Sequence, residues 1–446
     1  MKRPHFPGLR SAALILAFAG ASHVALADNL LEVFELAADN DPTVREARAQ
    51  YGVAHTSVLE GVAGLLPQVT VNGSSARNTR ASRERHSFAN GFNTHNYSVV
   101  LSQSLVNFQA WYAFQAAREQ DSQGLATLAL AEQQLIVRVA TAYFDVLRSQ
   151  NNLTLLRGQE NAAQQVMDQA QQRYDLGFAE IADVYDSQAA YSQARVNRMD
   201  EENILRQRIQ ALEVITGSPH QMLETLSEEF PVVSADPVNL NEWLRLTREN
   251  NLNVRAANHL LAANQNQARA AKAAMLPTLS INARYTDNAE QANTYGSALP
   301  TEASLNTMIS LDVSVPLFRG GANRARMQRA YYTVDANREA LERTERQSEA
   351  LTRNSFNSIE TAVMTVQARL ENITIAQNAL EATEVGMEVG TRNVVDLVQA
   401  QRTLFQAQRD YANARYDYVL NTLTLKQAAG TLNPQDVVDL NDWLVP

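Results

Sequence analysis

The sequence contains no cysteine among its 446 residues. Disulfide bonds, thiolate metal sites and a lipidated N-terminal cysteine are therefore excluded. Glycine and proline are scarce, with 17 and 12 residues, and this scarcity predicts long, uninterrupted helices. Beyond the first 27 residues, no stretch is apolar enough to predict a transmembrane helix.

The sequence also lacks the motifs of common enzymes. There is no GxxxxGKS/T phosphate-binding loop, no GxGxxG segment after a predicted strand and no HExxH zinc motif. We therefore expect no enzymatic activity, no cofactor and no metal site, so a partner has to supply any energy that the function needs. The formal net charge of −10 argues against nucleic acid as a partner.

Residues 1–27 have the pattern of a secretory signal peptide. Three basic residues lead into an apolar core over residues 12–21, and Ala25-Leu26-Ala27 provides a small-x-small cleavage site before Asp28. The apolar run is too short to span about 30 Å of hydrocarbon as an anchor. Cleavage removes three positive charges and no negative ones, which leaves −13 on an exported chain.

Two parts of the chain repeat each other in the same order. The segment NLLEVFELAADNDPTVRE at 29–46 matches NLNEWLRLTRENNLNVRA at 239–256. The segment LPQVTVN at 66–72 matches LPTLSIN at 276–282, with the same offset of 210 residues. Matches that keep their order and offset over this length predict a duplicated structural unit.

The duplication extends to a polar turn. GFAEIADVYDSQ begins at Gly177 and GTRNVVDLVQAQ begins at Gly390, and each places an aspartate six residues after its glycine. We therefore divide the exported chain into two repeats, 28–235 and 236–446.

Each repeat opens with a helical stretch, which the first copy interrupts near Asp41-Pro42. Two segments of alternating apolar and polar residues follow, and this alternation predicts a strand hairpin. The hairpins occupy 67–107 and 277–318, and their polar loops lie near 79–94 and 289–303.

A very long helix follows each hairpin. Residues 108–176 and 322–389 contain no proline and few glycines. At 1.5 Å per residue, each would extend for roughly 100 Å, so the helices have to pack along one another as coiled coils. A glycine turn then ends each long helix, and the chain returns in a second helix over 181–216 or 394–429.

Four strands per chain are too few for a membrane barrel. An exported protein without a transmembrane helix can enter an outer membrane only as a closed barrel, and the smallest barrels have about eight strands. Several copies have to contribute, and three would give twelve strands above twelve long helices. The strand pattern itself leaves two, three or four copies open.

The chain resembles the TolC family of outer-membrane efflux and type I secretion channels. The matching stretches are LLPQVTV, TAYFDVL, SVPLFRGG, VGTRNVVDLVQAQRTL and YANARYDYVLNTLTLKQAAGTLNPQDV. The resemblance implies a mainly α homotrimer, in which an α-helical periplasmic tunnel joins a shared 12-stranded β-barrel in the outer-membrane lipid of a Gram-negative bacterium.

The same resemblance implies a function and partners. The channel passively exports secreted proteins, small toxic compounds or both across the periplasm and outer membrane. It docks to a periplasmic adaptor (membrane fusion) protein and to an ABC or RND transporter in the inner membrane.

The resemblance also assigns the periplasmic aperture, the gate at the helical tips. Asp396 falls on an aperture position, Arg392 on a position that ties neighbouring helices together, and Asp183 on the partner of that tie. Gln399 stands where the family has a second aperture aspartate, and Met387 stands where it has a tip tyrosine. Asp186 occupies the corresponding place in the first repeat and can carry some of the lost negative charge. The full set implied is Asp396, Gln399, Arg392, Asp183, Asp186 and Met387. The simpler reading of both Asp183 and Asp396 is an acidic residue in a helical first turn.

The two glycine turns are the expected adaptor contact, and the simpler alternative is a plain helix-ending turn. The residues are Leu176, Gly177, Phe178, Ala179, Val389, Gly390 and Thr391.

Two other functions are alternatives to an export channel. A periplasmic coiled-coil scaffold or adaptor conflicts with the strand hairpins. A helical hydrolase that uses Asp183 and Asp186 conflicts with the missing motifs.

Overall fold

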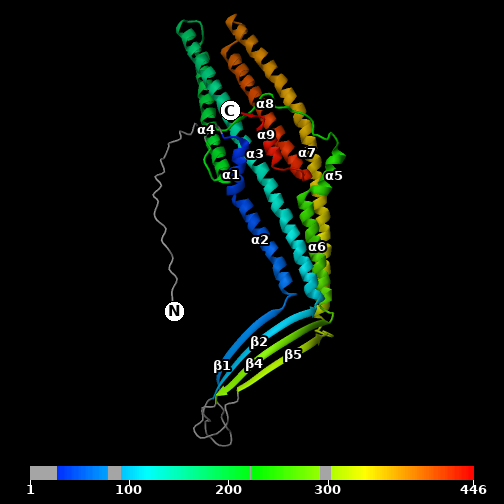
Figure 1. Ribbon diagram of the computed structural model, residues 1–446. Coiled ribbons are helices and arrows are strands. Elements are labelled where there is room, and N and C mark those ends of the chain that lie inside the picture. Colours follow the sequence, from blue (N-terminus) through cyan, green and yellow to red (C-terminus); the bar gives the residue numbers. More distant parts are fainter. Residues whose placement is uncertain (1–27, 79–91, 221, 292–302) are drawn as a thin grey trace, which may run out of the picture.

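The computed structural model describes residues 28–78, 92–220, 222–291 and 303–446. The molecule is elongated, with a four-stranded sheet at one end and two helical hairpin tips at the other (Figure 1). The predicted signal peptide lies outside the described residues, as does most of both predicted loops, 79–94 and 289–303.

Four long helices form two hairpins. In the first hairpin, α3 (Phe108–Asp175) packs against α4 (Ile181–Thr216), and in the second, α7 (Ala322–Glu388) packs against α8 (Val394–Ala429). The predicted long and returning helices are thus present, and each long helix ends one residue before its predicted end. Among the described residues, no helix has both the length and the apolar character to cross a membrane.

Five shorter helices complete the helical part: α1 (Leu30–Asn40), α2 (Pro42–Ala63), α5 (Leu240–Asn250), α6 (Leu252–Ala273) and α9 (Gln435–Asn441). The predicted break at Asp41-Pro42 separates α1 from α2. Asp41 is buried and its carboxylate accepts the Val44 amide at 2.8 Å, while Pro42 occupies the first turn, where no amide donor is needed. Asn251 separates α5 from α6 in the same way.

The sheet contains β1 (Gln68–Asn78), β2 (Phe92–Val106), β4 (Thr278–Gln291) and β5 (Ala303–Ser314). All neighbours are antiparallel and their order is β1-β2-β4-β5, so both predicted hairpins form and pair through β2 and β4. The strands run further than expected. Residues 92–94 and 289–291 were predicted to lie in loops, but Phe92 pairs with β1, and 93–94 and 289–291 pair between β2 and β4.

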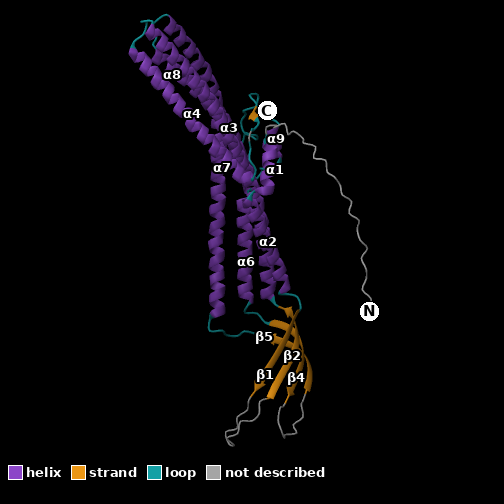
Figure 2. Ribbon diagram, turned by 90° about the vertical axis from the view of Figure 1, so that its left-hand side faces the viewer, coloured by secondary structure: helices purple, strands orange, loops and turns teal. Residues whose placement is uncertain are grey.

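The helices next to the sheet repeat the order of its strands. α2 packs on α3, α3 on α6 and α6 on α7, so the helix that leads into or out of each strand lies beside that of the neighbouring strand. Figure 2 shows these helices side by side above the sheet, and the upper parts of α3, α4, α7 and α8 lean away from them. The chain is therefore a curved slice with two open edges, one at β1 and α2 and the other at β5 and α7.

The largest apolar core lies midway along the helices. It includes Val33 on α1, Tyr143 and Phe144 on α3, and Leu425 on α8, all at most 1% exposed. A small sheet of β3 (Thr225–Leu226) and β6 (Leu444–Val445) covers this core together with α9. The sequence analysis did not predict this sheet or α9.

Candidate functional site

The four-stranded sheet has one apolar face and one polar face. Val71 pairs with Val99, which pairs with Tyr285, and Leu101 pairs with Ala283, which pairs with Ile309. Because side chains alternate across a strand, these residues share one face, and Val71 and Ile309 are 71% and 72% exposed on it. Residues of the intervening positions form polar contacts, such as Asn282 Nδ2 to Asp312 at 2.6 Å. An exposed apolar face opposite a polar face is the pattern of a strand between lipid and a water-filled lumen.

The two hairpin tips are built by the same backbone turn. Gly177 and Gly390 have φ values of 79° and 76°, a left-handed conformation that glycine adopts without strain. In the first tip, the Phe178 amide donates to the Arg173 carbonyl at 2.7 Å, and in the second the Thr391 amide donates to Gly386 at 2.8 Å. These bonds satisfy the last carbonyls of α3 and α7. The glycine caps predicted from the sequence are confirmed.

Asp396 begins α8 as half of a capping box. Its carboxylate accepts the Asn393 amide at 3.3 Å, and the Asn393 side chain accepts the Asp396 amide at 2.9 Å. The sequence predicted an acidic residue in this first turn but not its pairing with Asn393, although the spacing of Asn393 and Asp396 is the signature of a capping box. The carboxylate is fixed by its own helix and remains half-exposed.

Arg392 lies directly over the end of α7. A methyl group at the buried Gly386 would stand 2.6 Å from Arg392 Cγ, so only glycine leaves room for the arginine stem. Arg392 Nη1 is 3.9 Å from Asp396 Oδ2, which is a loose contact between exposed groups. Within the described part of one chain, no ion pair joins Arg392 to Asp183.

The other residues predicted for the aperture lie on both hairpins. Asp183 is in the first turn of α4, and its amide donates to the Glu180 carbonyl at 3.1 Å. Asp186 and Gln399 are exposed. Met387 is half-buried beside Val394 and Leu397, in a cluster that fastens α7 to α8 just below the turn. The structure therefore brings Met387 and Arg392 together at the second tip.

The predicted adaptor contact is strongly apolar for an exposed turn. Leu176 and Phe178 are 71% and 75% exposed, and Val389 is 69% exposed in the second turn. Both turns lie at the same end of the molecule, opposite the sheet (Figure 1).

Ion pairs hold the first hairpin together below its tip. Arg198 on α4 contacts Glu160 on α3 and Glu202 one turn away. Hydrogen bonds from Arg198 lower the pKa of Glu202 and raise the pKa of the guanidinium. In the second hairpin, Arg369 pairs with Asp410 at 3.2 Å. No group of three potential metal ligands occurs in the part of the chain that the structure describes.

Together, a two-faced sheet and long helical hairpins define a channel subunit that joins a membrane to a helical duct. The family model described as outer membrane efflux protein matches residues 33–218 and again 243–431. The chain belongs to the outer membrane efflux protein family, and it is an export channel of the outer membrane.

Individual relatives agree with this assignment. The outer membrane protein TolC of Vibrio cholerae is 32% identical over 426 residues, covering 94% of each chain. The proteases secretion protein PrtF of Dickeya chrysanthemi is 26% identical, covering 96% of this chain and 94% of its own. A solved structure of CusC superposes with a TM-score of 0.79 at 16% identity, covering 91% of this chain and 92% of its own.

Proposed function

We propose that three copies of the chain close a continuous duct for export. The open edges of the sheet support this proposal. β1 pairs only with β2 and β5 only with β4 among the described strands, so each copy offers one free edge on either side. Unpaired strand edges are costly in lipid, and four strands are half of the smallest known barrel. Joining β5 of one copy to β1 of the next removes every edge, and three copies give twelve strands.

The helices offer the same kind of edge. α2 and α7 flank the helix layer, directly beside β1 and β5. A rotation that joins the sheet edges also brings α7 of one copy to α2 of the next. Barrel and helical tunnel therefore close together, with the polar face of the sheet lining the barrel.

The hairpin tips then surround the far mouth of the duct. Asp396 of three copies forms a ring of carboxylates, and Arg392 reaches Asp183 of a neighbouring hairpin and holds the mouth closed. The loose Arg392–Asp396 contact supports this role, because it leaves the guanidinium free to turn toward a second carboxylate. The exposed Leu176, Phe178 and Val389 dock a periplasmic adaptor, through which an inner-membrane transporter drives export.

The matched free edges carry this proposal, and the mass of the assembly tests it. Native mass spectrometry of the detergent-solubilised protein should give three times the mass of the exported chain. The protein should also be found in the outer-membrane fraction, and in a denaturing gel it should migrate as a larger species before heating than after, because heating separates the copies. A monomer, or recovery only from the soluble periplasmic fraction, would support the coiled-coil scaffold instead.

A further inference from the structure

A collar of sequence at the junction of sheet and helices has an unusual charge. We define the collar as residues 59–70, 104–115, 268–280 and 312–330, which surround the helix-proximal strand ends (Figure 2). It contains six basic residues and two acidic ones, a formal charge of +4 in a chain of −10. The basic residues are Arg269, Lys272, Arg319, Arg324, Arg326 and Arg329.

Among the described residues of a single copy, no carboxylate forms an ion pair with the arginines of the collar. All four arginines between 319 and 329 are exposed, and none forms an ion pair within the described residues. Further along α7 the pattern changes. Arg338 pairs with Asp335 at 2.8 Å, and Arg346 pairs with Glu342. The first turns of α7 thus hold positive charge without an ion pair among the described residues, whereas two arginines further along pair within the helix.

The placement of these arginines is unfavourable for an isolated helix. The N-cap residue of α7 is Gly321, which has no side chain to cap the helix, and the first turn contains no acidic residue. Cations near a helix N-terminus are disfavoured by the helix dipole, whose positive end lies there. An anionic partner at the same place removes this cost and pairs the guanidinium groups.

The collar is also apolar on its surface. Leu317 and Phe318 precede Arg319 and are 90% and 85% exposed, and Trp111 at the start of α3 is 47% exposed. Leu317 and Phe318 follow shortly after β5, which carries Val313, 66% exposed, on the apolar face of the sheet. Aromatic and basic residues directly beside a lipid-facing surface are typical of the membrane–water interface.

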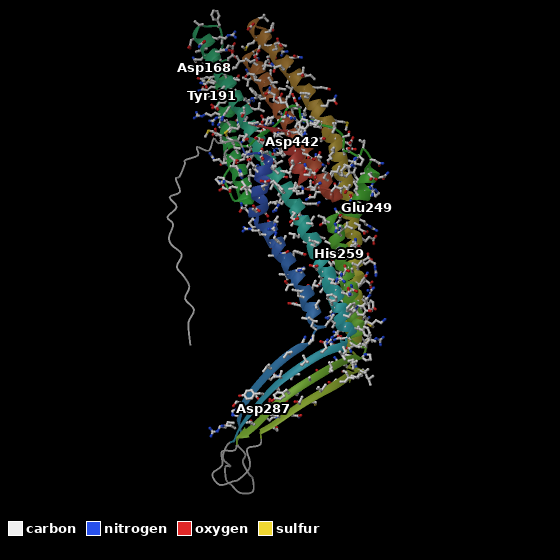
Figure 3. All side chains as sticks on the ribbon, viewed as in Figure 1. Asp168, Tyr191, Glu249, His259, Asp287 and Asp442 are labelled. Atoms are coloured by element: carbon white, nitrogen blue, oxygen red, sulfur yellow. The ribbon has the colours of Figure 1, made fainter. Side chains whose placement is uncertain are left out.

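We propose that the collar binds anionic phospholipid of the leaflet that faces the periplasm. This inference rests on the proposed membrane insertion of the sheet. Leu317, Phe318 and Trp111 enter the acyl boundary, and the guanidinium groups of Arg319 and Arg324 pair with headgroup phosphates. Arg326 and Arg329 line a groove between α3, α6 and α7 and add to the local positive potential. Figure 3 labels Asp168 toward the hairpin tips and Asp287 at the far end of the sheet, so neither acid competes within the collar.

Lipid binding by the full-length assembly tests the proposal. Phosphatidylglycerol and phosphatidylcholine of identical chains are titrated into the detergent-solubilised protein, and bound lipid is counted by native mass spectrometry. Wild-type protein should prefer phosphatidylglycerol at low salt, and the preference should fall at 0.5 M salt. Each arginine removed should weaken phosphatidylglycerol binding about fivefold, from about 1 kcal/mol per charge.

The test variant is R319Q/R324Q/R326Q/R329Q, and the matched control is R338Q/R343Q/R346Q/R353Q on the same helix beyond the collar. The first should lose the preference, and the second should keep it. Both should retain the assembled mass and conduct in bilayers, which separates failure of this inference from failure of the channel proposal.

Four results would overturn the inference. Wild-type protein could bind phosphatidylglycerol and phosphatidylcholine equally, and this result would overturn the inference without any variant. The collar variant could keep its preference. Inorganic phosphate alone could displace phosphatidylglycerol at equal concentration, which would assign the site to free phosphate. The collar variant could fall apart into monomers without lipid, which would assign the arginines to contacts between copies, such as with Glu60 on the facing α2.

Discussion

At the scale of single residues, the second hairpin tip combines a fixed carboxylate with a movable cation. Asp396 is held by Asn393 in the capping box, whereas Arg392 touches Asp396 only loosely and lies over Gly386. A change at Asp396 therefore alters both the charge of the mouth and the cap of α8. A change at Gly386 alters the position of the arginine without changing any charge.

Asp396→Asn separates charge from capping. The amide oxygen of asparagine can still accept the Asn393 amide, so α8 should keep its start, while the negative ring disappears. We expect reduced cation preference, measured as a reversal potential across planar bilayers in a salt gradient. Asp396→Ala should lose the same preference and also fray the start of α8 by about 0.5–1 kcal/mol, seen as faster amide exchange at residues 393–396. An unchanged permeability ratio in Asp396→Asn would place the selectivity elsewhere.

Gly386→Ala should act through Arg392. The added methyl group would stand 2.6 Å from Arg392 Cγ, so the arginine has to leave its position. We expect a more open mouth and higher single-channel conductance. The control is Gly390→Ala, where φ is 76° and the methyl group meets nothing within 4 Å. That variant strains the turn without touching Arg392 and should conduct like wild type. An equal rise in conductance in both variants would show that turn strain governs the mouth, and wild-type conductance in Gly386→Ala would contradict the role of Arg392.

Glu224 gives the central core a dependence on pH. Burial, with a smaller effect of Glu32, raises the pKa of its carboxyl group. The folded state therefore holds this proton more tightly than the unfolded state, so stability falls as pH rises through the raised pKa. Glu224→Gln should raise the Tm at pH 8 but not at pH 4, measured by near-UV circular dichroism. The exposed Glu229→Gln is the control, and an equal gain at both pH values would contradict the assignment.

At the scale of elements, the sequence was most informative where one signal extended over many residues. The missing prolines located both long helices to within one residue at each end, and the alternation around Val69 and Val99 located the strands. The short elements β3, β6 and α9 were missed, because two-residue strands carry no periodicity and form only by pairing across 220 residues, as Thr225 does with Val445. The strand ends were also misplaced, since the segments 92–94 and 289–291 adjoin polar loops and carry no clear alternation, yet cross-strand pairing extends them.

The continuity of α3 makes it sensitive to proline at its centre. Ala140 is 1% exposed, in the middle of a helix of 68 residues. Ala140→Pro removes one backbone hydrogen bond and clashes with the preceding turn, at a cost of about 3 kcal/mol or more. We expect little assembled protein in the outer membrane, measured by quantitative immunoblot. Ala140→Gly should cost only about 1 kcal/mol and assemble. Normal assembly of the proline variant would mean that α3 tolerates a break.

At the scale of the whole molecule, one chain has an open sheet and an open layer of helices. Duplication gives it two strand hairpins and two helical hairpins in the same order, and neither the sheet nor the helix layer closes on itself. The sequence predicted this incompleteness, because four strands are too few to close a membrane barrel. It could not predict the geometry of the proposed contact between Arg392 and Asp183, since that contact would depend on a neighbouring hairpin rather than on any pattern within one chain.

The most direct test of the account is the single-channel conductance of the assembled protein with and without Arg392. Wild-type protein should form small, cation-preferring channels in planar bilayers, because three Arg392–Asp183 ties, each worth about 0.5–1 kcal/mol if exposed, hold the mouth closed. Arg392→Ser should give a clearly larger conductance from trimers of unchanged mass. The account is contradicted if Arg392→Ser conducts like wild type, or if wild-type protein already forms a wide, anion-selective pore.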